Sequence, residues 1–170
     1  MKIIILGAGQ VGSTLASLLS QEDNDVTVVD LDDKALSQLE EKDDINTVKG
    51  GCTFPTTLIA ADIKSADMVA AVTGSDEINI VACLISKVLS SNIKTIARIR
   101  ESSYLRGATQ KAIEEGVIPV DIVVSPEKLI TDHLQALIDT PGSLQVLEFG
   151  NGILNLVGVK AVNGGPLIGH

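Results

Sequence analysis

Apolar residues in this chain form short runs that alternate with helical stripes, and the runs have the length of buried strands. Residues 2–6 read Lys-Ile-Ile-Ile-Leu, and the next run, Asp25–Asp30, is also rich in β-branched residues. Similar runs predict further strands at 46–49, 67–72, 95–100 and 121–124. Strands that are almost continuously apolar are typical of a parallel sheet covered on both faces.

Between these runs, apolar positions recur every three or four residues, which predicts helices. We expect the helices at 11–19, 32–42, 55–61, 78–89 and 104–115. Ser75 or Asp76 would cap the fourth helix, and Gly116 suits the residue that follows the fifth. Strict alternation of strands and helices predicts an α/β fold, a Rossmann-like doubly wound parallel sheet over about residues 1–124.

The alternation stops after residue 124. Pro126 suits the first turn of a helix with one apolar stripe that runs to about Asp139. Two apolar segments, 144–149 and 154–159, then flank Gly-Asn-Gly, which indicates a β-hairpin. We expect a crossover helix or linker at 125–140 and the start of a truncated C-terminal subdomain at 141–170, because a lone hairpin is only marginally stable. The chain would then be a fragment of a longer protein.

The first strand leads into a glycine-rich turn, Gly7-Ala8-Gly9-Gln10-Val11-Gly12. Gly7 would permit the tight turn, Gly9 would let a pyrophosphate approach the backbone, and Gly12 would let the next helix pack closely. The phosphates would face free N–H groups at the positive end of that helix. Asp30, 18 residues after Gly12, could bind a ribose diol and repel a 2′-phosphate. The pattern predicts nucleotide binding, and a purely structural glycine turn is the alternative.

Two arginines, Arg98 and Arg100, lie two positions apart in the fifth predicted strand, so they would share one face of it. They stand at the end of the strand that lines the ligand site in sheets of this class. One of them could reach a phosphate of the nucleotide or an acid across a subunit interface. A solvated strand end with surface ion pairs is the alternative interpretation.

The composition excludes some classes of binding partner and of cellular location. The net charge of −9 argues against nucleic acid, and one tyrosine with two phenylalanines offers no platform for stacking bases. No apolar run reaches the ~18–20 residues that span a bilayer, and Met1 leads directly into a strand rather than a signal peptide. Cys52 and Cys83 have neither metal-ligand nor disulfide spacing, so we expect reduced thiols in a cytoplasmic protein without a metal site.

Catalytic residues are not recognisable beside the nucleotide motif. A dehydrogenase needs an acid or base, and the two histidines are His133, in the tail helix, and His170, the last residue. No Tyr-x-x-x-Lys pair is present. The sequence therefore predicts a nucleotide site without an enzyme's chemistry. Two alternatives stay open: a fragment of a small NAD-dependent oxidoreductase, and a dimerisation scaffold with a vestigial site.

Two helices carry more apolar surface than one domain needs. The helix at 78–89 is apolar nearly all round, for which deep burial is the simplest explanation, and the tail helix has a stripe at Ile130, Leu134, Leu137 and Ile138. Such surfaces indicate a protein partner, most commonly a second copy of the chain. We expect at least a homodimer, with the helix at 126–139 crossing onto the other subunit. Glu127 could bind a divalent cation with its counterpart there, or interact with its own helix dipole.

Several motifs together resemble the RCK (KTN) family of regulatory domains, in its branch of TrkA-type peripheral subunits of Trk potassium uptake systems. The resemblance covers the whole chain and rests on residues 2–12, 28–30, 71–79, 97–100, 125–127 and 154–159. It implies a subunit that binds NAD(H), or alternatively ATP or ADP, in a Rossmann cleft. It also implies a homodimer, a cytoplasmic ring beneath the cell membrane, and an integral membrane potassium-translocating subunit that the ring gates.

The resemblance also implies which residues bind the nucleotide. They are Gly7, Ala8, Gly9, Gln10, Val11, Gly12, Asp30, Leu31, Thr73, Gly74 and Arg98. One position departs from the family. The turn after the third strand often reads Gly-Asp-Ala-Thr, whereas here it is Gly50-Gly51-Cys52-Thr53. A carboxylate that could accept a hydrogen bond from the adenine amine is therefore missing.

Overall fold

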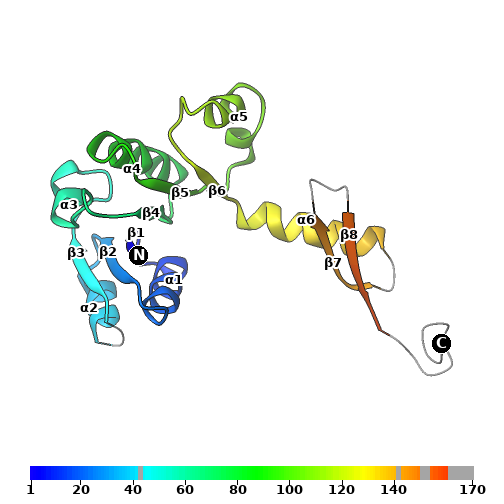
Figure 1. The fold of residues 1–170 in the computed structure, drawn as a ribbon, viewed down its shortest axis with the longest axis horizontal. Helices are drawn as coiled ribbons and strands as arrows, with labels where there is room; N and C mark the ends of the chain where they lie inside the picture. The colour runs from blue at the N-terminus through cyan, green and yellow to red at the C-terminus, as the bar shows by residue number, and fades with distance from the viewer. Residues whose placement is uncertain (42–43, 141–142, 150–153, 161–170) are drawn as a thin grey trace. The chain divides into compact units, whose positions relative to one another are not determined.

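The computed structural model describes residues 1–41, 44–140, 143–149 and 154–160 (Figure 1). By internal contacts the chain forms two compact units, Met1–Ser125 and Pro126–His170. The first unit contains a six-stranded parallel sheet with the strand order β3-β2-β1-β4-β5-β6. This order confirms the predicted doubly wound, Rossmann-like sheet. The finer division at residues 124 and 140 stays a prediction.

The strands and helices of the first unit alternate along the chain. In order they are β1 (Lys2–Leu6), α1 (Gln10–Ser20), β2 (Asp25–Asp30), α2 (Asp33–Glu40), β3 (Asn46–Lys49), α3 (Pro55–Ala60), β4 (Met68–Ala71), α4 (Asp76–Leu89), β5 (Lys94–Arg98), the 3₁₀ helix η1 (Ser102–Leu105), α5 (Gly107–Glu114) and β6 (Ile122–Val124).

Two hydrophobic cores lie on opposite faces of the sheet. Alternate residues of β1 separate between them: Ile3 and Ile5 pack with α1 and α2, whereas Ile4 and Leu6 pack with the residues of α3 and α4. Figure 1 shows the same two layers, with α1 and α2 on one side of the strands and α3 and α4 on the other. The strand order reverses at β1, so its carboxyl end is the point where sheets of this class bind ligands.

Helix α4 buries an unexpected set of side chains. The buried positions are Asp76, Asn79, Ala82, Cys83 and Ser86, all of them small or polar. The aliphatic residues Ile78, Val81, Leu84 and Val88 are exposed instead, Val88 by 73 %. The prediction that this helix is deeply buried, which was the simplest explanation of its apolar sequence, is therefore wrong. The helix presents an aliphatic surface to solvent.

Some element boundaries differ from the prediction. Helix α4 begins at Asp76 rather than at residue 78, because Ser75 caps it by accepting a hydrogen bond from the Ile78 N–H. The helix predicted at 104–115 is divided into η1 and α5, because Arg106 is extended and Gly107 has a φ of +60°. Gly116 has a φ of +75° and follows α5 as expected.

The second unit contains α6 (Pro126–Asp139) and an antiparallel pair, β7 (Ser143–Phe149) and β8 (Leu154–Val159). The helix and both hairpin strands were predicted, while the Gly-Asn-Gly turn at 150–152 lies outside the described residues. Ile130, Leu134 and Ile138 of α6 are exposed. Among the described residues, no helix has the length and apolar character needed to cross a membrane.

Candidate functional site

The glycine turn between β1 and α1 is tightly packed on one side and open on the other. Gly7 has a φ of +109°, and a Cβ there would lie 3.1 Å from the Thr73 backbone. A Cβ on Gly12 would lie 1.8 Å from the Gly7 carbonyl oxygen, so α1 could not pack this closely with any other residue. A Cβ on Gly9 would meet no atom within 4 Å. The turn therefore leaves space at Gly9, where the sequence predicts the pyrophosphate.

The amino end of α1 is available to an anion. Gly9 is the N-cap residue and supplies no side-chain hydrogen bond, and the first turn of the helix contains no acidic residue. Gln10 and Val11 are exposed at this end. The first N–H groups of a helix have no partner within the helix, and together with the helix dipole they favour negative charge here.

The Asp30 carboxylate lies directly beside the glycine turn. Its Oδ2 accepts a hydrogen bond of 2.6 Å from the Ala8 N–H, and its Oδ1 accepts one of 2.8 Å from the Asp32 N–H. These bonds fix the acid between the turn and the start of α2, and each oxygen keeps a lone pair for a further donor. The neighbouring Leu31 is 70 % exposed at the same edge.

The turn after β3 lies next to the end of β2. The Gly50 N–H donates to the Asp30 carbonyl, and the Cys52 Sγ lies 3.7 Å from the Val29 carbonyl oxygen. Burial, with the charge of Asp30 as a smaller cause, raises the pKa of the Cys52 thiol to about 11. Cys52 is thus a neutral packing residue at physiological pH, and Gly51 offers only backbone groups to a base.

The end of β4 and the loop after it form the other side of the site. Thr73 follows β4 and contacts the glycine turn through the close approach to Gly7 described above. Its N–H and hydroxyl both donate to the Asn79 side-chain oxygen, at 2.9 and 2.7 Å. Gly74 is exposed, and its carbonyl accepts a hydrogen bond from the Arg100 guanidinium.

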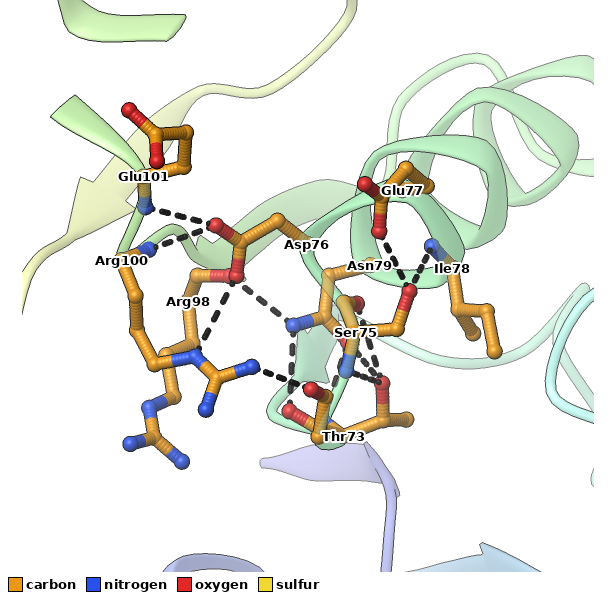
Figure 2. A network of polar contacts seen from close by, with 10 residues as sticks. Thr73, Ser75, Asp76, Glu77, Ile78, Asn79, Arg98, Arg100 and Glu101 are labelled. Carbon is orange, nitrogen blue, oxygen red and sulfur yellow. Dashed lines mark hydrogen bonds and ion pairs between the residues drawn. The ribbon is translucent and has the colours of Figure 1, made fainter. Parts of the chain in front are cut away.

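The two arginines do not share a strand face, because β5 ends at Arg98. Ala97 and Ile99 pack in the core beneath α4, so the half-buried Arg98 side chain lies on the face that carries α1. Arg100 turns instead to the first turn of α4, where its Nε lies 3.5 Å from Asp76 Oδ1. In Figure 2 the Arg98 guanidinium points away from Asp76. The ion-pair interpretation therefore holds for Arg100, which pairs with Asp76.

The family-level comparison agrees with this arrangement. The family model of the TrkA-N domain matches residues 3–126. The chain belongs to the TrkA-N domain family. It is 49 % identical over 171 residues to the Trk system potassium uptake protein TrkA of Halomonas elongata. That alignment covers 100 % of this chain and 37 % of the relative, so the chain spans little more than a third of the relative's length.

Solved structures share the TrkA-N fold. The TrkA-N domain of the inner membrane protein ybaL from Escherichia coli has a TM-score of 0.70 at 19 % identity, over 81 % of this chain and 96 % of that domain. A GsuK channel bound to NAD has a TM-score of 0.69, also at 19 % identity, over 88 % of this chain and 25 % of the channel chain. At these identities the likeness establishes the fold alone.

The residues predicted from the TrkA-N motifs lie at the carboxyl ends of four neighbouring strands. Asp30 ends β2 and Leu31 follows it, the glycine turn follows β1, Thr73 and Gly74 follow β4, and Arg98 ends β5. Their role in binding stays a prediction. Glu127 belongs to the second unit, in the first turn of α6. Among the residues that the structure describes, no three His, Cys, Asp or Glu side chains gather in a group that could hold a metal ion.

Proposed function

We propose that this chain is the nucleotide-sensing part of a non-catalytic regulatory subunit of a potassium uptake system. It binds NAD(H), or alternatively ATP or ADP, at the carboxyl edge of the sheet. The observation that carries the proposal is the combination of open space at Gly9 with the Asp30 carboxylate 2.6 Å from the Ala8 N–H. A merely structural turn has no need of the space at Gly9. The name of the Halomonas relative supports the role in potassium uptake.

The nucleotide would extend along the sheet edge in the order of the strands. Its adenosine ribose would bind Asp30 on β2, and its first phosphate would lie on the glycine turn after β1. The remainder would continue toward Thr73 and Arg98 at the ends of β4 and β5. An NAD-bound GsuK channel with the same fold supports NAD as the ligand.

The same proposal includes assembly. The aliphatic surface of α4 and the apolar stripe of α6 would be covered by further copies of the chain, as a homodimer and then a ring. The ring would lie on the cytoplasmic side and contact an integral membrane potassium-translocating subunit. Exchange of the nucleotide would favour one arrangement of the paired domains, which the ring would transmit.

The test is a thermal unfolding series with NAD⁺, NADH, NADP⁺, ATP and ADP. Ligand at ~100 times its Kd should stabilise the fold by ~2.7 kcal/mol. Stabilisation by any of them, without turnover of NADH, supports the proposal. No stabilisation by any of them would leave a dimerisation scaffold, and consumption of NADH with a small carbonyl substrate would favour an oxidoreductase fragment.

Asp30 gives this proposal a specificity test. Asp30→Asn removes the charge that repels a 2′-phosphate, so the preference for NAD⁺ over NADP⁺ should fall by about tenfold, roughly the value of one charge-assisted hydrogen bond. Isothermal titration calorimetry with both cofactors measures it. The control is Asp33→Asn, an exposed acid of equal charge in α2 whose partner is Lys49. Equal affinity of the parent chain for NAD⁺ and NADP⁺ would refute the role of Asp30.

A further inference from the structure

The first turn of α4 contains two buried polar side chains, Asp76 and Asn79, which are 6 % and 0 % exposed. They lie three residues apart, on the same face of the helix. Each side chain reaches the backbone beyond a neighbouring strand (Figure 2). Most buried polar groups in proteins are hydrogen-bonded, and here the partners of these two side chains are the segments that form one side of the nucleotide site.

Asn79 fixes the spacing between the ends of β4 and β5. Its Oδ1 accepts hydrogen bonds from the N–H and hydroxyl of Thr73, at 2.9 and 2.7 Å. Its Nδ2 donates to the Arg98 carbonyl at 2.8 Å and to the Thr73 carbonyl at 3.4 Å. One side-chain amide therefore hydrogen-bonds both strand ends, through its oxygen and through its nitrogen. A side chain without these groups would leave the two strand ends unconnected.

Asp76 holds the loop that follows β5. Its Oδ2 accepts hydrogen bonds from the N–H groups of Arg100 and Glu101, at 2.9 and 2.7 Å. Its Oδ1 faces the Arg100 guanidinium, which also donates to the Gly74 carbonyl. Asp76 and Arg100 thus connect the Gly74 loop after β4 to the loop after β5.

We propose that Asp76 and Asn79 are positioning residues for the part of the nucleotide beyond its first phosphate. They do not touch the nucleotide themselves, and they act through Thr73, Gly74 and Arg98. The inference rests on the proposed function. The strand order gives the direction in which the nucleotide would extend. The ribose and first phosphate would lie at the ends of β2 and β1, and the rest would lie at β4 and β5, on the other side of β1.

This placement predicts that the loss of affinity depends on how far the nucleotide extends beyond its first phosphate. AMP ends at its single phosphate on the glycine turn, so loss of Asn79 should hardly change its affinity. ADP and NAD⁺ extend past the turn toward Thr73 and Arg98, so their affinity should fall. A merely structural role would weaken all three nucleotides by the same factor, because it would reduce the population of the folded chain.

The experiment is calorimetry of the full 170-residue chain with AMP, ADP and NAD⁺. For Asn79→Ala and for Asp76→Asn we expect about tenfold weaker binding of ADP and NAD⁺, and less than about a twofold change for AMP. Asn79→Asp keeps the acceptor for Thr73 but lacks the donor to Arg98, so its loss should be intermediate. The matched control is Ser86→Ala, a buried polar residue on the same face of α4 whose hydroxyl donates to the Ala82 carbonyl.

The outcomes separate the two hypotheses. If the parent chain binds none of the nucleotides, the proposed function fails. If the parent binds them but the variants lose AMP and NAD⁺ equally, or lose neither, the positioning role is overturned. If the variants do not fold, hydrogen exchange of the parent chain decides: NAD⁺ should slow exchange of the Thr73, Arg100 and Glu101 amides, and AMP should not. Unchanged exchange with NAD⁺ would overturn the role.

Discussion

At the scale of single residues, Gly9 and Gly12 have opposite surroundings although they stand three positions apart. Gly12 is in contact with the Gly7 backbone, whereas Gly9 faces open space. Gly12→Ala should destabilise the fold by several kcal/mol, because backbone atoms must move to admit the Cβ. Gly9→Ala should leave the unfolding free energy within about 0.5 kcal/mol of the parent but weaken nucleotide binding. Urea unfolding and calorimetry measure the two effects.

The two variants control for each other, since both add one methyl group to the same turn. Gly74→Ala is a further control for stability alone, because a Cβ there also meets no atom within 4 Å, whereas Gly74 is itself a predicted binding residue. A Gly9→Ala chain that binds NAD⁺, ADP and ATP as well as the parent would show that the open space does not hold the phosphates.

The residues that sequence reasoning missed are the polar ones on the buried face of α4. The glycine turn and Asp30 are recognisable because their spacing is set by the turn itself. Asp76 was expected only as a possible cap of the helix, and Asn79 only as part of the 71–79 motif, and neither was assigned to the nucleotide site. Hydrophobic periodicity assigns polar positions to solvent, but here the strand ends supply buried backbone partners that the pattern cannot reveal.

At the scale of elements, the strands were predicted more closely than the helices. The bounds of β2 and β3 agree residue for residue, and a polar or glycine residue marks one end of each, since Asn24 precedes β2 and Gly50 follows β3. Helix α5 was predicted too long. The break at Arg106–Gly107 depends on backbone angles, and the spacing of apolar residues does not reveal these angles. Predicted β5 was also too long: Arg100 belongs to the loop that Asp76 holds.

In addition to the backbone pairing of β5 with β6, one carboxylate joins the start of the edge strand β6 to β5. Asp121 Oδ2 accepts hydrogen bonds from the Thr95 N–H and hydroxyl, at 2.7 and 3.0 Å, and lies 2.9 Å from Lys87 Nζ. Burial alone would raise the pKa of Asp121, but the bonds from Lys87 and Thr95 outweigh it and lower the pKa below its ordinary value.

A lowered pKa has a defined consequence for stability. The ionised Asp121 stabilises the folded chain above the unfolded pKa of about 3.9, and this contribution is lost as the pH falls through the folded value. Asp121→Asn should therefore lower the free energy of unfolding at pH 7, and the difference from the parent should shrink toward pH 3. Urea titrations at both pH values measure it, with exposed Asp33→Asn as the control. An Asp121→Asn deficit that persists unchanged at pH 3 would contradict the assignment.

At the scale of the whole molecule, assembly should depend on the exposed apolar positions of α6. Ile130 and Leu134 are 62 % and 54 % exposed and lie four residues apart. The double substitution Ile130→Asp, Leu134→Asp should shift the chain from dimer to monomer at tens of micromolar. Multi-angle light scattering measures the mass.

The matched control is Thr131→Asp, Gln135→Asp, which adds the same charge at the same spacing on neighbouring exposed positions of α6. This control should remain dimeric. A parent chain that is monomeric at these concentrations, or a control that dissociates equally, would contradict the role of the α6 stripe.

The lengths of the outermost strands have a consequence for aggregation. The sheet of the first unit ends in β3 and β6, which have four and three residues. Short edges offer few free backbone groups to a strand from another molecule, a feature by which natural sheets avoid uncontrolled growth. The hairpin of the second unit has strands of seven and six residues, with Leu156, Val157 and Val159 exposed on β8. Amyloid-like pairing between copies would therefore begin at this hairpin rather than at β3 or β6, and Val157→Lys should suppress it while leaving the nucleotide edge untouched.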